Sequence, residues 1–428
     1  MRQVGIDKRG MELMVPCSMS EPPRRVRMSE PMRRQGVMRF EMPEDTLPPD
    51  HRARLIWRVL ETLDLSAFSA KAKAVEGRAG RNALSTSMLL TLWLYGISGG
   101  IGSAREIARR VESDDAFKWI VGDQEVKHAS LSAFRVSHGA ALQKLMTDVL
   151  GALLHKGLLS LDRVAQDGTR VRASASAPSF RREPSLLECR QQATLHLKAV
   201  LAEAEQDTTA AEKAARIAGA RDYQRRVEAA IATVQSLRDE GKEKPRASTT
   251  DAEARVMKMP DGGFRPGYNI QLATAGSELG GPRTVVGLLV TNSGSDMGSI
   301  TPMLKDIEAR TGQLPGQLLA DAGHARHECV NATAALGVEL IMAVPKHEQC
   351  TKTPGSPPVE AWRARMKTDE AKRAYRARAA LCELSNAHLK CHHGTADMLV
   401  RGIAKVTCVA LLGAIAANIL AHANAWLV

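Results

Sequence analysis

The chain has 428 residues, with 59 Lys and Arg against 47 Asp and Glu, which gives a formal net charge of +12. Its hydrophobic content of 44% and charged content of 25% are those of an ordinary globular protein, so wholesale disorder, a collagen-like repeat and a disulfide-rich scaffold are excluded. The length predicts two or three domains. The basic balance favours a polyanionic partner, and nucleic acid is a commoner one than a membrane surface.

The seven cysteines are scattered and form no Cys-x-x-Cys pair, so we expect reduced thiols in a cytoplasmic protein. Residues 1–40 contain arginines among proline and methionine, without the apolar core of a secretory signal. The most apolar stretch, residues 406–420, is shorter than the roughly 20 residues of a membrane span. It predicts a buried core helix and no membrane partner.

Residues 1–45 lack sustained periodicity, which predicts a basic flexible arm. Residues 46–159 follow a helical pattern throughout and predict an all-α domain. The glycine-rich residues 99–102 interrupt this pattern, and no strand precedes them, so we expect a turn between helices there and no dinucleotide-binding loop. Ser103 and Glu106 have the spacing of a capping box that begins the next helix.

Three short helices are expected after this turn: one near residues 103–112, one beginning at residues 113–114, and one after residue 128. Such a group is typical of a helix-turn-helix-like module, whose third helix enters the major groove of DNA. The candidate contacts to phosphates or bases are Lys127, His128, Arg135 and His138. A helical packing domain with a basic rim fits the same pattern, and both interpretations stay open.

Strands and helices alternate from residue 160 onward, which predicts an α/β fold. The expected strands cover residues 161–169, 269–275, 284–292, 317–320 and 339–344. The expected helices cover residues 299–311, 327–336, 368–393 and 399–423. The second and third strands are expected to pair as a hairpin, and the fourth is expected to lie beside the first. An Ala-, Glu- and Arg-rich segment at about residues 180–245 predicts a helical hairpin insertion, which serves as a spacer or an oligomer contact.

Two of these strands end in an aspartate near a glycine, at Asp167-Gly168 and at Asp321. Carboxylates at strand ends face a shared crevice in α/β sheets. A third acid, Glu383, lies on the helix after the last strand. Oxygen-rich clusters of this kind bind Mg²⁺, and two such ions assist phosphoryl transfer. Single Asp-Gly pairs are weak signals, but their placement on strand, strand and helix favours a metal site.

With these residues in place, the sequence resembles the DDE transposases of bacterial insertion sequences, whose core has the ribonuclease H-like fold shared with retroviral integrases. The motifs that carry the resemblance are residues 100–106, residues 128–135, residues 162–168, residues 267–271, residues 319–323, and Tyr375, Arg378, Glu383 and Lys390. The resemblance implies an α/β ribonuclease H-like catalytic core with a mixed five-stranded sheet in residues 160–428. The preceding helices would then be the helix-turn-helix-like N-terminal domain.

The resemblance also implies roles for individual residues. Asp167, Asp321 and Glu383 would be the metal-binding catalytic triad for two Mg²⁺ ions, with Mn²⁺ able to substitute. The residues implied to contact DNA near the cleaved phosphate are Tyr375, Arg378 and Lys390. Glu383 and Lys390 are two helical turns apart and share a face, whereas Arg378 is somewhat askew from Glu383. Asn269 and Gln271, on one strand beside the acids, are expected to orient metal ligands or the scissile phosphate.

The implied function is that of a DNA transposase, which cleaves the ends of its element and transfers the 3′-hydroxyl into target DNA. Its partners would be double-stranded DNA, as terminal inverted repeats and as target, and further copies of the chain in a homodimer or larger assembly on DNA. Its location would be the bacterial cytoplasm, associated with the nucleoid. The alternatives are an inactive or repurposed transposase that only binds DNA, and a metal-dependent nuclease on the same fold.

The sequence departs from the family pattern at a few points. His324 stands where relatives commonly have a tyrosine, and residues 384–389 lack the usual aromatic residue. The short interval between Asp321 and Glu383 leaves no room for a large β insertion. A zinc site is a further alternative in this region, because three possible ligands share one helix face: His388, Cys391 and His392.

Overall fold

The computed structural model describes residues 42–70, 82–122, 124–203, 209–276, 280–345, 354–392 and 394–428, and the short antiparallel strands β1 (Gly5–Ile6) and β2 (Glu12–Leu13). The chain divides into two compact units, Met1–Met42 and Pro43–Val428. The expected basic arm lies almost entirely outside the described residues. All that follows concerns the second unit.

The first part of this unit is helical, as predicted. Its elements are η1 (Pro43–Thr46), α1 (Arg52–Glu61), α2 (Ser66–Ser69), α3 (Thr86–Ser98), α4 (Ala104–Ser113), α5 (Asp115–Val121), α6 (His128–Ser137) and α7 (Gly139–His155). Ser103 caps α4 by accepting the backbone N–H of Glu106 at 3.4 Å. The Glu106 carboxylate pairs with Arg109 and Arg110 and does not return to Ser103. Only half of the predicted capping box therefore forms, because two nearby guanidinium groups compete for the carboxylate.

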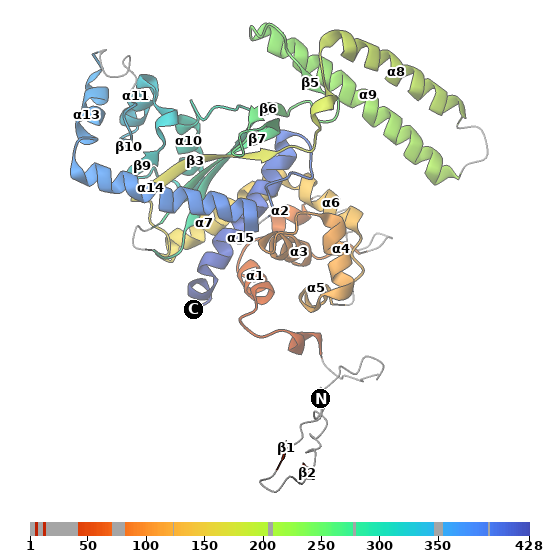
Figure 1. Ribbon diagram of the computed structural model, residues 1–428, viewed down its shortest axis with the longest axis horizontal. Helices are drawn as coiled ribbons and strands as arrows, with labels where there is room; N and C mark the ends of the chain where they lie inside the picture. Colours follow the sequence, from red (N-terminus) through yellow and green to blue (C-terminus); the bar gives the residue numbers. More distant parts are fainter. Residues whose placement is uncertain are drawn as a thin grey trace. The chain divides into compact units, whose positions relative to one another are not determined.

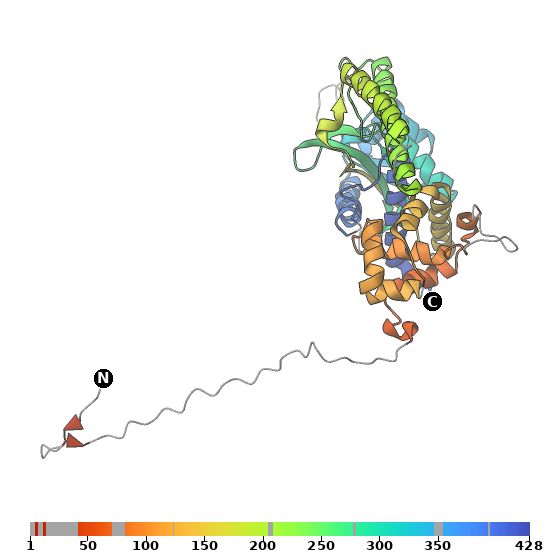
Figure 2. The same ribbon diagram turned by 90° about the vertical axis from the view of Figure 1, so that its right-hand side faces the viewer.

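The predicted helical hairpin insertion is present. It comprises η2 (Ala177–Ser179), β4 (Phe180–Arg181), α8 (Glu183–Glu203), α9 (Ala210–Asp239) and β5 (Ala247–Ser248). The two helices lie side by side and extend away from the sheet (Figures 1 and 2). A small buried cluster of Leu186, Ala230, Val234 and Ala247 holds the base of the hairpin.

The predicted mixed sheet is also present. Its strands are β3 (Arg163–Arg172), β6 (Arg255–Lys258), β7 (Phe264–Ala275), β8 (Thr284–Thr291), β9 (Gln317–Ala320) and β10 (Glu339–Met342). Their order is β10-β9-β3-β7, with β8 and β6 pairing with different parts of β7. The β9 strand is parallel to β3 and β10, and the other pairs are antiparallel. Five strands stand where the sequence predicts them, and β6 is an addition. This arrangement is consistent with a ribonuclease H-like core.

Helices cover both faces of the sheet. They are α10 (Ile300–Thr311), the short η3 (Ala322–His324), α11 (His327–Ala335), α13 (Pro357–Arg365), α14 (Asp369–Ala387) with its π-helical extension η4 (His388–His392), and α15 (Ile403–Trp426). The helix α14 crosses one face, where Ala165, Leu319 and Ile341 of three strands pack against it. The helix α10 packs on the opposite face, where Met303 and Ile307 approach Gly287 of β8.

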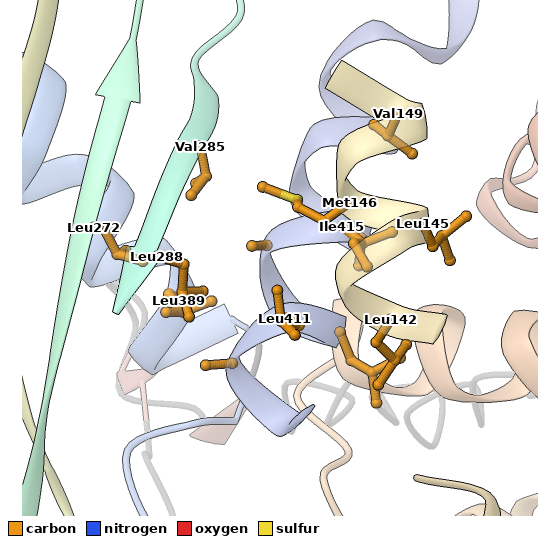
Figure 3. Packing of buried hydrophobic residues seen from close by; sticks show 14 of the residues in the cluster. Leu142, Leu145, Met146, Val149, Leu272, Val285, Leu288, Leu389, Leu411 and Ile415 are labelled. Carbon is orange, nitrogen blue, oxygen red and sulfur yellow. The ribbon is translucent and has the colours of Figure 1, made fainter. Parts of the chain in front are cut away.

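The helix α15 joins the helical region to the sheet. It packs against α1, α3 and α7 on one side and β8 on the other. Figure 3 shows Leu411 and Ile415 of α15 between α7 and β8. Asn418 also bonds Val285 on β8: its Oδ1 accepts from the Val285 N–H and its Nδ2 donates to the Val285 carbonyl, each at 2.8 Å. Among the described helices α15 alone is long and apolar enough to cross a membrane, and 67% of its apolar window is buried in the fold. The expected boundary near residue 159 therefore lies within one compact unit with a shared core.

Candidate active site

Two aspartates lie next to each other at the centre of the sheet. The parallel strands β3 and β9 pair Gln166 with Ala320, so the next residues, Asp167 and Asp321, are lateral neighbours. Adjacent strands are about 4.8 Å apart. Side chains alternate along a strand, and the residues two positions earlier, Ala165 and Leu319, pack against α14. Both carboxylates therefore lie on the face that α14 covers.

The helix α14 supplies the partners of these carboxylates. The Tyr375 hydroxyl donates to Asp321 Oδ1 at 3.5 Å, and Asn386 Nδ2 donates to Asp167 Oδ2 at 3.1 Å. The guanidinium of Arg378 lies 5.7 Å from the Tyr375 ring centroid and interacts with both carboxylates. The structure thus brings together four of the residues that the sequence singled out, and it adds Asn386.

The surroundings of Asp167 raise the pKa of its carboxyl group. Burial raises the pKa of its carboxyl group, and the neighbouring Asp296 and Asp321 raise it further. Arg378 and the backbone N–H of Gly168, which donates to Asp167 Oδ1 at 2.9 Å, act in the opposite direction. Burial by itself lowers the pKa of Arg378, but the nearby carboxylate of Asp167 has the opposite effect, and the net result is a raised pKa. A site that holds two carboxylates at this cost favours an additional cation.

Gly168 explains why a glycine follows the first aspartate. A Cβ at this position would overlap Gln271 Nε2 and Asp296 Oδ1, and it would lie 3.0 Å from Asn269 Oδ1. These groups form a hydrogen-bonded cluster in which Asp296 Oδ1 accepts from Asn269 at 2.7 Å and from Gln271 at 2.5 Å. Leu272 pairs with Asp167, so the side chains of Asn269 and Gln271 lie on the opposite face of the sheet, where their direct partner is Asp296. The sequence analysis missed Asp296 because it lies in a polar loop after β8 and no motif marks it.

A buried polar chain continues from this cluster. Gln166 Nε2 donates to Ser299 Oγ at 2.9 Å, and Ser299 Oγ lies 3.2 Å from His324 Nδ1. His324 is 1% exposed, and burial lowers its pKa, against the opposing effect of Asp296, Asp167 and Asp321. His324 therefore lies close to the carboxylates, and its burial favours the uncharged form of the imidazole.

Three buried side-chain atoms in this region have no hydrogen-bond partner within the described part of the chain. They are Asn386 Oδ1, on the side chain that contacts Asp167, and Gln166 Oε1 and His324 Nε2, in the polar chain through Ser299. An orphaned buried polar atom is costly, and it usually indicates a water molecule or ion in the functional protein. The unpartnered Asn386 Oδ1 and the paired carboxylates together fit a divalent cation and its bound water, held by Asp167 and Asp321.

Glu383 and Lys390 are the remaining residues that the sequence assigns to this site. Glu383 is exposed, one helical turn before Asn386, whereas its neighbour Cys382 is 2% exposed and packs on the sheet. Burial and Asp167 raise the pKa of the Cys382 thiol. Lys390 lies in η4, where burial lowers its pKa. Within the described ranges, no three His, Cys, Asp or Glu side chains form a ready metal-binding group, so the role of Glu383 stays a prediction.

The candidate DNA contacts of the helical region differ in their exposure. Lys127 and His128 at the start of α6 are exposed, and Lys127 lies 3.5 Å from Glu125. Arg135 is 5% exposed, bonds the Gly102 carbonyl at 2.7 Å, and has its pKa lowered by burial to about 10. The expected surface position of Arg135 is therefore not observed, because this face of α6 packs inside the helical region.

His138 is also held within the fold. Its ring nitrogens lie 2.9 Å from the Phe134 carbonyl and 3.1 Å from the Phe68 carbonyl. The zinc alternative has no support among the described side chains. His388 and Cys391 lie in the π-helical turn η4, and the side chain of His392 lies outside the described part of the structure.

Two family models match the chain. Residues 41–137 match a transposase domain, DUF772, and residues 323–421 match a transposase DDE domain. No curated protein and no solved structure gives a match. Both models are of transposase domains, and the mixed sheet is consistent with the ribonuclease H-like core of the DDE class. The chain is a transposase with a DUF772 N-terminal domain and a DDE transposase domain.

Proposed function

We propose that this chain is an active transposase that cuts DNA at the ends of its element and joins the freed 3′-hydroxyl to target DNA. The observation that carries the proposal is the adjacency of Asp167 and Asp321 beneath α14, within reach of Arg378. DDE transposases generally use divalent metal ions, and this pair of carboxylates has the chemistry to hold one.

Asp167 and Asp321 would hold the cation, and Glu383 would complete the set from the rim of α14. When bound there, two Mg²⁺ ions, or Mn²⁺ in their place, would supply activation of the attacking oxygen and stabilisation of the leaving oxygen in phosphoryl transfer. Asn386 holds one oxygen of Asp167, and Tyr375 holds one oxygen of Asp321, so both carboxylates are oriented before DNA arrives. Arg378 and Lys390 would neutralise phosphate oxygens of the bound DNA.

The DNA partners in this proposal are the terminal inverted repeats and the target duplex. The charge of +12 and the exposed Lys127 and His128 at the start of α6 support binding by the helical region. Two ends must be held together during transposition, which supports a homodimer or larger assembly on DNA. The projecting α8–α9 hairpin is the element best placed for that contact (Figure 1).

The test is cleavage and joining of a labelled duplex taken from the DNA that flanks the gene, with Mg²⁺ or Mn²⁺. Asp167→Asn and Glu383→Gln should abolish product, because each removes a negative charge from the metal site. Glu370→Gln is the matched control, since Glu370 is an exposed carboxylate in the first turn of the same helix. Product at the wild-type level from Asp167→Asn would refute the proposal.

One observation favours a second candidate, a transposase that retains DNA binding alone. Glu383 is exposed, and the described residues contain no ready three-ligand metal group. In that case the wild type would shift the duplex in a salt-sensitive manner without cutting it. Glu383→Gln would then bind DNA as the wild type does.

A further inference from the structure

The strands β6 and β7 extend the sheet as a two-stranded ribbon, residues 255–265. Lys258 lies opposite Phe264, and Val256 lies opposite Pro266. The tip is closed by two backbone bonds, from Met259 N–H to the residue 263 carbonyl at 2.7 Å and from the residue 262 N–H to the Met259 carbonyl at 3.0 Å. The ribbon is therefore an ordered structure.

One side of this ribbon exposes apolar surface. Directly opposed residues of antiparallel strands share a face, so Val256, Lys258 and Phe264 lie on the same side. Phe264 is 71% exposed and Val256 is 49% exposed, whereas Met257 on the other side is 3% exposed. Phe264 is also the one aromatic residue among the large hydrophobic side chains exposed in the described part of the chain. A rigid exposed aromatic beside a cation indicates a binding surface.

The exposed side of the ribbon is continuous with the catalytic face. Leu272 lies opposite Asp167, and Phe264 is separated from Leu272 by an even number of residues along an unbroken register. Side chains alternate along a strand, so Phe264 and Asp167 are on the same face of the sheet. At about 3.3 Å per residue, Phe264 lies roughly 25 Å along the strand from the level of Asp167. That distance corresponds to about seven base pairs of DNA.

The charge of the ribbon identifies the kind of partner. Residues 255–265 contain Arg255, Lys258 and Arg265 against the single carboxylate of Asp261. Arg265 lies 2.9 Å from Asp261, whereas Lys258 is exposed beside Phe264.

Two arginines of β3 hold the ribbon in place. Arg170 donates to the Lys258 carbonyl at 3.3 Å and to the residue 294 carbonyl at 2.9 Å. Arg172 lies 3.7 Å from Asp261. Both arginines also face carboxylates, Arg170 at 3.8 Å from Asp296 and Arg172 at 3.7 Å from Asp397. The exposed aromatic therefore sits on a fixed support beside the exposed Lys258 ammonium, which complements a phosphate backbone and not a basic second copy of this chain.

We propose that the β6–β7 ribbon binds DNA next to the catalytic face, with Phe264 stacked on an unpaired base and Lys258 on a neighbouring phosphate. The inference rests on the proposed function, because it places this contact on the DNA held at Asp167 and Asp321. Bases inside a duplex have their faces covered by stacking, so an exposed aromatic ring finds a free partner on an unpaired base.

The experiment measures binding of fluorescein-labelled dT20 and of a 20-base-pair duplex to the full chain by anisotropy, without metal. Phe264→Ala should weaken binding of dT20 by about 5- to 150-fold, the range expected for loss of one stacked base, and should affect the duplex much less. Phe264→Trp should restore binding. Lys258→Ala should lower the dependence of log K on log salt by about 0.7, as for one phosphate contact on a single strand.

The matched control is Leu336→Ala, because Leu336 is 37% exposed at the end of α11, which packs on β10 at the opposite edge of the sheet from β6. Phe264 is exposed, so its replacement should leave thermal unfolding unchanged. Binding of dT20 by Phe264→Ala within twofold of the Leu336→Ala control would overturn the proposal, as would a change in self-association alone. If the wild-type protein binds dT20 through Phe264 but does not cleave DNA, the proposed function is refuted and the ribbon contact is retained.

Discussion

Replacing Gly168 by alanine tests the packing of the site most directly. The new methyl group would overlap Asp296 Oδ1 and Gln271 Nε2. Both atoms belong to one hydrogen-bonded cluster in which Asp296 accepts from Asn269 and Gln271. One of these side chains must move, and the Asp296 carboxylate then loses at least one amide donor.

The magnitude follows from the bonds at stake. A hydrogen bond to a charged group contributes about 1.5–3 kcal/mol, and forced overpacking costs about 1–3 kcal/mol. The Asp296 side chain is 27% exposed, so water replaces part of what is lost. We expect Gly168→Ala to lower the free energy of unfolding by about 2–4 kcal/mol.

Urea unfolding monitored by circular dichroism measures this change as a lower midpoint at an unchanged slope. Gly151→Ala is the matched control, because Gly151 is exposed within α7 and a Cβ there meets nothing within 4 Å. It should stabilise the protein by about 0.5–1 kcal/mol. Combining Gly168→Ala with Asp296→Ala should cost less than the sum of the two single changes by about 1 kcal/mol or more. A Gly168→Ala protein as stable as the wild type would refute the reasoning.

Three further outcomes are expected. Asp167→Asn should be more stable than the wild type at neutral pH, because burial raises the pKa of the folded Asp167 carboxyl. The wild-type protein loses stability as pH rises from about 4. Thermal unfolding at pH 4–8 should therefore show that the stability difference in favour of Asp167→Asn grows with pH. Asn386→Leu removes the donor to Asp167 Oδ2, so the acidic limb of the pH–cleavage profile should move to higher pH, and an unmoved limb would contradict this role. Arg135→Met should lower the free energy of unfolding by about 2–4 kcal/mol, because it removes the hydrogen bond to the Gly102 carbonyl and the contact with the Trp93 ring. Lys127→Ala should change stability by less than about 0.5 kcal/mol and lower the salt slope of duplex binding by about 1. Equal stability of the two variants would contradict the buried position of Arg135.

Local sequence patterns predicted most of the secondary structure. The alternation and apolar runs of the predicted strands place β7, β8, β9 and β10 correctly, because burial of one strand face imposes period two on the sequence. The start of β7 was missed, since residues 264–267 become a strand by pairing with β6, which carries no strong signal of its own. The predicted helix over residues 368–393 changes to a π-helical turn after Ala387, where Leu389 becomes buried.

The composition of the site was only partly accessible from sequence. Asp167 and Asp321 could be found because each ends an apolar run, and strand ends in α/β sheets converge. Asp296, His324 and Asn386 could not, since their contacts join a loop, a short helical turn and α14 across the sheet. Arg135 was expected at the surface because helical periodicity does not reveal which polar residue a neighbouring helix will cover.

The sequence by itself determined that this is a basic α/β protein with a helical N-terminal region, a helical insertion and two aspartates at strand ends. Only the tertiary structure decided that those aspartates are neighbours, that Asn386 faces them while Glu383 is exposed, and that Gly168 makes room for Asp296. The physical reason is that strand register and the rotation of a helix over a sheet depend on pairing between distant segments. Spacing within one segment fixes which residues share a face, but it leaves open what that face meets.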